Sequence, residues 1–99
     1  MGAQGTAIVD FGAYPGSPDA SVDVAGQAAI LTTSAAEAWL RPQDATAENS
    51  VDMHIMASNM MEVIAGPITA ADGFPIRCIS RDGTNFVGTF NLNWVWNGP

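Results

Sequence analysis

The chain has 99 residues, of which three are Lys or Arg and ten are Asp or Glu, so its formal net charge at pH 7 is −7. Three cations cannot neutralise a run of phosphates, which excludes a general nucleic-acid binder. No stretch approaches the roughly 18 uninterrupted apolar residues of a transmembrane helix, which excludes a transmembrane protein. We therefore expect neither nucleic acid nor a membrane as a partner. The length is that of one domain of about 100–150 residues, and we expect a single domain over residues 1–99.

Short apolar stretches between turn residues predict about seven strands. The segment 12–19 holds two Pro and two Gly, so it cannot continue a strand and is predicted as a loop. The polar segment 42–50 is predicted as an exposed excursion. The predicted strands cover residues 5–11, 20–24, 27–31, 36–41, two parts of 51–66, 73–80 and 86–96.

Two of these stretches fit helix and strand patterns alike. The alanines around Trp39 favour a helix, but Pro42 would end it within about three turns, and helices that short are marginal. We therefore expect a strand over 36–41, centred on Trp39. The stretch 51–66 contains four of the five Met residues, and we expect two strands that are broken near Ser58.

The last two predicted strands show the clearest pattern. In 86–96, every second residue from Phe86 to Trp96 is aromatic, Leu or Gly, and the residues between them include Thr89, Asn91 and Asn93, which is typical of a long, half-buried strand. Asp82 and Gly83 favour a tight turn before it, so we expect 73–80 and 86–96 to form an antiparallel hairpin. The whole pattern predicts an all-β fold, a single antiparallel β-sandwich with an immunoglobulin-like or jelly-roll-like layout. The predicted core contains Phe11, Trp39, Phe90, Leu92 and Trp94.

The residues that could carry chemistry are scattered along the chain. His54 is the only histidine and would share its strand face with Asp52, but no nucleophile or further metal ligand is near in sequence. We expect it to be exposed or paired across strands. Cys78, the only cysteine, lies on the apolar face of its predicted strand and is expected in the core. We expect no enzymatic activity, no metal and no cofactor.

The composition of the chain suits contact with other proteins. Charged residues make up 13% of it, which is about half the usual share, and it has no Lys to guard its sheet edges. Two interpretations fit these features equally well. The surface packs against another chain, or it is merely polar and neutral. Four Met residues are interleaved with Asp and His, so some of them are expected to face a partner. The residues predicted to make contacts are Tyr14, Met53, Met56 and Met60.

Three runs of the sequence resemble short proteins encoded by tailed bacteriophages and prophages. They are TAIVDFGAYPGSPDASVDVAGQ near the N-terminus, EAWLRP around Trp39 and FNLNWVWN near the C-terminus, and together they cover less than half of the chain. The proteins they resemble look like accessory virion proteins of the capsid cement or decoration type, or like small tail-associated domains. The runs carry strand and turn residues, so the resemblance supplies no site residue.

The resemblance implies a cement or decoration protein that binds the major capsid protein, stabilises the shell and self-associates as a dimer or trimer. Such a protein would be made in the bacterial cytoplasm and would lie on the capsid surface of the virion. The lone cysteine agrees with a reducing compartment, and residues 1–20 lack the basic start and the apolar stretch of a signal peptide. The alternative is a tail or fibre domain that binds a host-surface glycan through Trp39 or Trp96. A small hydrolase built on the scattered carboxylates is a third hypothesis.

Overall fold

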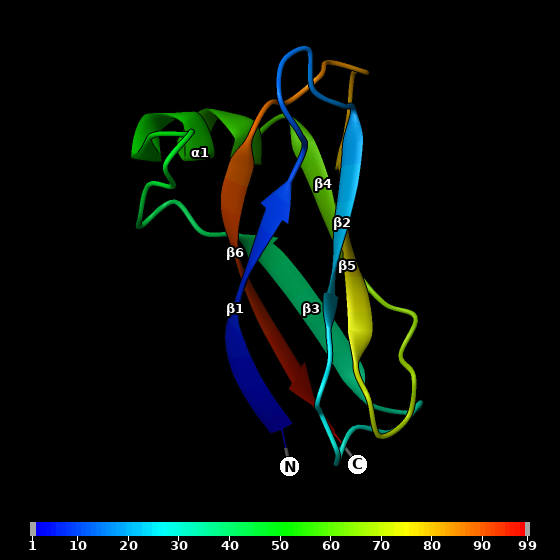
Figure 1. The fold of residues 1–99 in the computed structure, drawn as a ribbon. Helices are drawn as coiled ribbons and strands as arrows, with labels where there is room; N and C mark the ends of the chain where they lie inside the picture. The colour runs from blue at the N-terminus through cyan, green and yellow to red at the C-terminus, as the bar shows by residue number, and fades with distance from the viewer. Residues whose placement is uncertain (1, 99) are drawn as a thin grey trace.

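A computed structural model describes residues 2–98, which form two three-stranded antiparallel sheets packed face to face and one short helix (Figure 1). The sheets have the strand orders β1-β6-β3 and β2-β5-β4. The predicted all-β sandwich is confirmed, with six strands within the described residues where about seven were expected. The elements are β1 (Gly2–Asp10), β2 (Asp19–Val24), β3 (Ala35–Leu40), α1 (Val51–Ser58), β4 (Met61–Ala65), β5 (Phe74–Ser80) and β6 (Thr89–Asn97).

The strand order is that of an immunoglobulin-like sandwich. An immunoglobulin domain has its second, fifth and fourth strands in one sheet and its third and sixth strands in the other. Here β2-β5-β4 and β3-β6 repeat those two orders. The position that the last immunoglobulin strand occupies beside the sixth is taken by β1, which pairs antiparallel with β6. Of the two layouts expected, the topology therefore matches the immunoglobulin-like one.

The hydrophobic core lies between the two sheets, and β6 is its main contributor. Every second side chain of β6 is buried, as the alternation of 86–96 predicts. Four of the five predicted core residues, namely Phe11, Phe90, Leu92 and Trp94, are buried. The second sheet covers them with further buried side chains, which are those of Val24, Met61, Phe74, Ile76, Cys78 and Ser80.

Trp39 is the exception, because its side chain is 44% exposed and does not belong to the core. The predicted strand is present, but its register places Trp39 opposite Asn93, whose side chain is on the outer face of β6, and Leu40 opposite the buried Leu92. Leu40 is therefore the residue of β3 that enters the core. The prediction of a core position for Trp39 is wrong because it treated the centre of the strand as the buried position.

The predicted strand over 27–31 is absent, because this stretch forms a turn after Gly26, whose φ is +76°. The backbone N–H of Gln27 donates to the carbonyl of Asp72 at 2.6 Å, and the carbonyl of Ile30 accepts from Ala71 at 2.9 Å. The side chain of Ile30 is fully buried. The stretch is apolar because the side chain of Ile30 packs into the core, although its backbone belongs to neither sheet.

The first of the two strands predicted within 51–66 is also wrong, because residues 51–58 form α1, whereas the second strand is confirmed as β4. Ser50 is the N-cap of α1, and its hydroxyl accepts from the backbone N–H of Met53 at 3.2 Å. Such a cap satisfies a donor that the first helical turn leaves free. The cap and the packing of α1 on the sheet together explain why helix prevails over strand here.

The predicted hairpin between β5 and β6 does not form, because the two strands lie in different sheets. Asp82 does organise a turn, since its carboxylate accepts from the backbone N–H of Thr84 and the hydroxyl of Ser80, each at 3.0 Å. Hydrogen bonds from Thr84 and then Ser80 hold the pKa of this exposed carboxyl below its ordinary value. The chain after this turn crosses from the sheet of β5 to the sheet of β6. The turn predicted at Asp82 is therefore present, whereas the predicted pairing of β5 with β6 is wrong.

Candidate functional site

His54 is fully buried between α1 and the sheet, where it joins the helix to β6. Its Nε2 accepts from the backbone N–H of Asn91 at 2.9 Å, so the ring proton is on Nδ1, which lies 2.8 Å from the carbonyl of Ser50 and donates to it. The ring also meets Phe90 edge-on, with 5.0 Å between centroids. Both nitrogens are therefore engaged in structural hydrogen bonds, and the prediction of an exposed or strand-paired histidine is wrong.

Cys78 is fully buried at the centre of β5, as predicted. Burial raises the pKa of its thiol from the ordinary 9.0 to about 12. A thiolate is the form that acts as a nucleophile or metal ligand. The thiol therefore stays protonated in the folded chain at neutral pH, and Cys78 behaves as a small apolar core residue.

The raised pKa of Cys78 predicts a loss of stability at high pH. The unfolded thiol ionises near its ordinary 9.0 and the folded thiol near 12, so the free energy of unfolding should fall as the pH rises between these values. Urea unfolding at pH 8 and at a pH about midway in that window measures the loss. The variant Cys78→Ala is the control and should lose less stability over the same interval. Equal losses in both proteins would contradict the assignment.

The remaining ionisable side chains of residues 2–98 are exposed or, in the case of Arg41, partly exposed. Within residues 2–98, no three His, Cys, Asp or Glu side chains come close enough together to hold a metal ion. The ion pair between Arg41 and Asp44, at 3.0 Å, joins two neighbours in sequence on the surface.

One surface lies at the end of the sandwich that carries α1 and the long connections, which we call the loop end. It consists of the β1–β2 loop 11–18, the segment 44–58 and the β5–β6 connection 81–88. The backbones of Phe11 and Gly88 are joined at 2.8 Å, and those of Ser17 and Phe86 are joined by a β-bridge. The side-chain amide of Asn49 donates to the carbonyl of Val87 at 2.9 Å. These bonds tie the three segments into one continuous surface.

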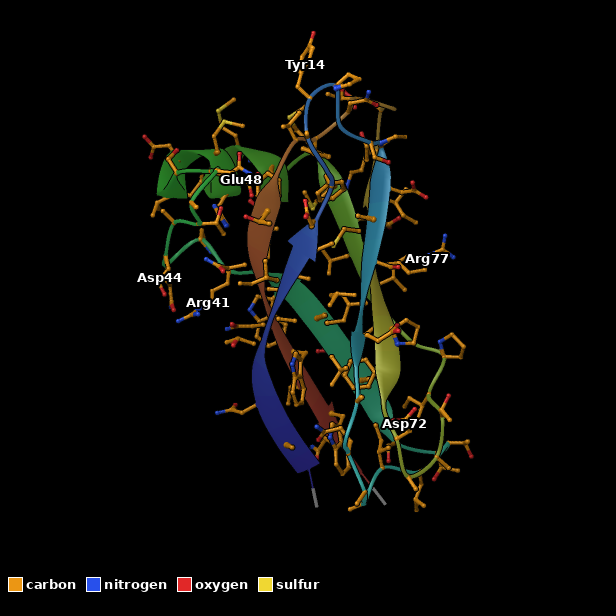
Figure 2. All side chains as sticks on the ribbon, in the orientation of Figure 1. Tyr14, Arg41, Asp44, Glu48, Asp72 and Arg77 are labelled. Atoms are coloured by element: carbon orange, nitrogen blue, oxygen red, sulfur yellow. The ribbon has the colours of Figure 1, made fainter. Side chains whose placement is uncertain are left out.

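The loop end exposes several large apolar side chains, and Tyr14 stands at its tip (Figure 2). Tyr14 is 87% exposed and Met56 is 59% exposed. The other large exposed apolar side chains of this surface are Met53, Ile55 and Val87. Three of the four residues predicted to make contacts, Tyr14, Met53 and Met56, are thus brought to one end of the molecule. Met60 is not among the exposed residues of this surface, because it is half-buried and packs against the core.

A second surface is the outer face of the sheet β1-β6-β3, where Trp39 is exposed. Thr6 and Trp39 lie on either side of Asn93 in the strand register. The Oδ1 of Asn93 is buried there without a hydrogen-bond partner among residues 2–98. Trp96, the other tryptophan proposed for glycan stacking, is buried, and its indole N–H donates to the side chain of Gln27 at 2.8 Å. Trp39 is the tryptophan that remains accessible.

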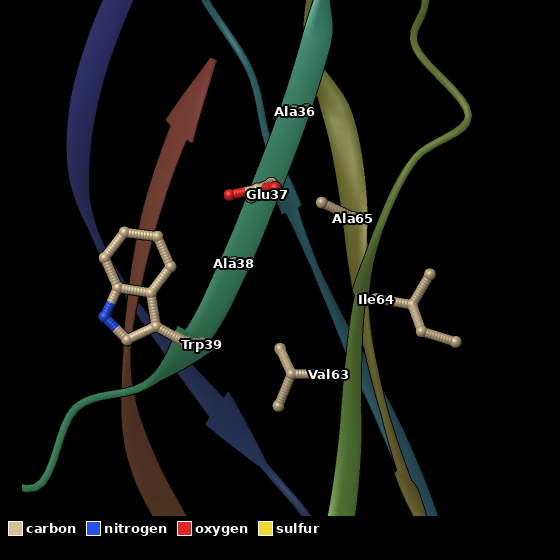
Figure 3. A pocket seen from close by; sticks show the side chains of 7 residues that line it. All are labelled: Ala36, Glu37, Ala38, Trp39, Val63, Ile64 and Ala65. Atoms are coloured by element: carbon tan, nitrogen blue, oxygen red, sulfur yellow. The ribbon is translucent and has the colours of Figure 1, made fainter.

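A third surface is a trench along the open side of the sandwich, between the edges of β3 and β4 (Figure 3). One hollow of the trench has a volume of about 480 Å³, and it is lined by Ala36, Glu37, Ala38, Trp39, Val63, Ile64 and Ala65. A second hollow continues it past Leu40 and Met61 to Arg81. Figure 3 shows Val63 and Ala65 directed toward β3 and Ile64 directed away. No pattern in the sequence indicated this trench.

Comparison with known proteins gives no family for the chain, since no family model and no curated protein sequence matches it. The helix α1, which is the helix of residues 2–98, is too short to cross a membrane.

Proposed function

We propose that this chain is a non-enzymatic accessory protein of a bacteriophage particle, a cement or decoration protein that docks on the major capsid protein through its loop end. The observation that carries the proposal is the group of exposed apolar side chains that includes Tyr14 and Met56. The resemblance of three sequence runs to accessory virion proteins supports a bacteriophage particle as the assembly to which the chain binds. Self-association as a dimer or trimer on the shell and a place on the capsid surface belong to the same proposal.

The chemistry of the loop end suits a protein partner. Scattered exposed apolar residues are ordinary, whereas apolar residues that gather on one surface indicate a contact site. Tyr and Met are enriched at protein interfaces, and the flexible Met side chain adapts to irregular partners. In the alternative, a glycan-binding tail or fibre domain, stacking would rest on Trp39 alone, because Trp96 is buried. The loop end therefore favours docking on protein.

The placement of the termini leaves the loop end free. Both ends of the described chain lie at the opposite end of the sandwich from Tyr14 (Figures 1 and 2). An affinity tag at the C-terminus should therefore not block docking, which makes a binding experiment straightforward.

The proposal predicts that charges placed on the loop end weaken docking without unfolding the chain. Tagged protein is mixed with shells assembled from the major capsid protein of the proposed phage particle, and the pelleted fraction is measured by sedimentation. The double variant Tyr14→Asp/Met56→Asp should lose at least about tenfold in affinity, since each residue would lose roughly 1 kcal/mol or more at an interface. Its circular dichroism spectrum should match that of the wild type.

The matched control is Leu31→Asp, which places a charge on an exposed apolar residue in the turn before β3, whose first residue, Ala35, pairs with Asn97 near the C-terminus. This variant should bind shells as the wild type does. Undiminished binding by the double variant, or an equal loss with Leu31→Asp, would show that the loop end is not the docking surface.

A further inference from the structure

The outer face of the sheet β1-β6-β3 carries few charges, although the chain has a net charge of −7. Its two carboxylates, those of Asp10 and Glu37, lie on the two outer strands of the sheet, and the strand between them has only uncharged side chains. The outer face of the other sheet instead carries four exposed charged side chains, which are those of Asp19, Asp23, Glu62 and Arg77. The face of β1-β6-β3 is therefore the side of the sandwich that suits an uncharged ligand.

A polar hollow of about 270 Å³ lies on this face. It is lined by Gln4, Gly5, Thr6, Arg41, Gln43 and Asn93. Among residues 2–98, the side chains of Gln4 and Thr6 have no hydrogen-bond partner, so they are available to a ligand. Amide and hydroxyl groups both donate and accept hydrogen bonds. The hollow therefore matches a ligand whose groups also do both, as the hydroxyl groups of a sugar do.

Asn93 lies at the centre of the face, between Thr6 of β1 and Trp39 of β3 in the strand register. Within residues 2–98, its Oδ1 is the buried side-chain oxygen that lacks a hydrogen-bond partner. A buried acceptor without a donor is unfavourable, because it has lost its bonds to water and gained none. A hydroxyl group that enters the hollow supplies the missing donor when the Asn93 amide turns toward it.

Trp39 adds an aromatic surface beside Asn93. Its side chain is 44% exposed, and Figure 3 shows the indole directed away from β4. An indole offers a large, rigid ring face at a small cost in conformational entropy, and the C–H groups on one face of a sugar ring pack on such a surface. Trp39 and Thr6 are two strand spacings apart, which is roughly 10 Å and comparable to the length of a disaccharide.

We infer that the outer face of β1-β6-β3 is a binding site for a neutral saccharide of at least two rings. One ring stacks on Trp39, and the hydroxyl groups of the next ring bond to the side chains of Asn93 and Gln4. The saccharide is neutral because the cation of the hollow, Arg41, is already paired with Asp44 at 3.0 Å, and the net charge of the chain repels an anionic sugar. The site uses none of the exposed apolar side chains of the loop end, so it does not depend on the proposed docking.

The test is an NMR titration of the full chain with three neutral oligosaccharides, maltotriose, cellotriose and chitotriose, and with trigalacturonate as the anionic comparison. At least one neutral sugar should bind with a Kd of about 1 mM or tighter. The amide shifts should centre on Thr6, Trp39 and Asn93. Trigalacturonate should bind at least about fivefold more weakly than that sugar. Absence of binding by all three neutral sugars at about 20 mM, equal binding of trigalacturonate, or shifts centred on another face would overturn the inference.

The variant Asn93→Val separates a role in binding from a role in folding. It should bind the sugar at least about fivefold more weakly, because it cannot accept the hydroxyl hydrogen bond. Its urea unfolding midpoint should not fall, since valine suits a strand and removes the unpaired buried oxygen. Unchanged affinity of this variant would show that Asn93 is not part of a sugar site.

The variant Trp39→Ala should likewise bind at least about fivefold more weakly, because the stacking surface is lost. Its matched control is Ile64→Ala, at a position of the other sheet that is 45% exposed, and this variant should bind as the wild type does. The variant Tyr14→Asp/Met56→Asp should also bind the sugar normally, whatever its effect on docking. Unchanged affinity of Trp39→Ala, or an equal loss in Ile64→Ala, would contradict the assignment of this face.

Discussion

Replacing Trp94 with alanine is expected to lower the free energy of unfolding by about 3–5 kcal/mol, a large share of the roughly 5–15 kcal/mol that stabilises a domain. Trp94 is 8% exposed and meets Phe74 of the other sheet edge-on at 5.9 Å between centroids. It also fits closely over Gly5, where an added Cβ would lie 2.5 Å from its ring. Its removal would leave a cavity that spans both sheets.

The matched control is Trp39→Ala, which deletes the same side chain from a position that is 44% exposed. This change should cost no more than about 1 kcal/mol, since surface substitutions rarely cost more. Urea unfolding followed by far-ultraviolet circular dichroism measures both variants. Similar losses for the two tryptophans would mean that the register of β3 or β6 is wrong.

Replacing His54 with alanine is the second change with a large expected effect, also about 3–5 kcal/mol. The backbone N–H of Asn91 would lose its acceptor in a buried site, Nδ1–H would no longer bond Ser50, and the contact with Phe90 would be lost. An unsatisfied buried donor alone costs about 1–3 kcal/mol, and the cavity adds the rest. Thermal or urea unfolding measures the total.

The variant His54→Gln distinguishes this hydrogen-bonding role from simple space filling. The side-chain oxygen of Gln can accept from Asn91 at the position of Nε2, so about half of the lost stability should return. His54→Leu fills similar volume without an acceptor and should recover less than His54→Gln. If the leucine variant were the more stable of the two, packing and not the bond to Asn91 would be what His54 contributes.

His54 also connects stability to the loop end. It holds α1 on β6, and α1 carries the exposed Met53 and Met56. A variant that detaches the helix should therefore dock poorly on shells even where the sandwich remains folded. Shell-binding results for loop-end variants accordingly need the circular dichroism control described above.

The parts of the fold that depend on local alternation were predictable from sequence. The pattern of β6 identified its buried face, and β1, β2, β3, β4 and β5 were found within a few residues of their bounds. The outward position of Trp39 was also readable, because Glu37 and Arg41 lie two residues to either side of it and share its face. Ser50 was a readable helix start that the apolar alternation of the Met-rich stretch concealed.

The pairing of strands was not predictable from the same patterns. The Asp82–Gly83 turn is real, but a turn signal does not say whether the next strand stays in the same sheet. The trench depends on β3 and β4, which come from different sheets, so no local pattern could reveal it. The exposed Tyr14 was predictable from its loop of Pro and Gly, whereas the pairing of that loop with residues 86–88 follows only from the crossing of β5 to β6.

Electron cryomicroscopy of shells decorated with the chain, at a resolution that shows side chains, tests the account most directly. We expect density for the two-sheet sandwich on the outer surface of the shell, with Tyr14 and α1 against the major capsid protein and the chain termini directed away from it. A particle in which the loop end points to solvent while another face contacts the shell, or shells that carry no such density, would contradict the central claim.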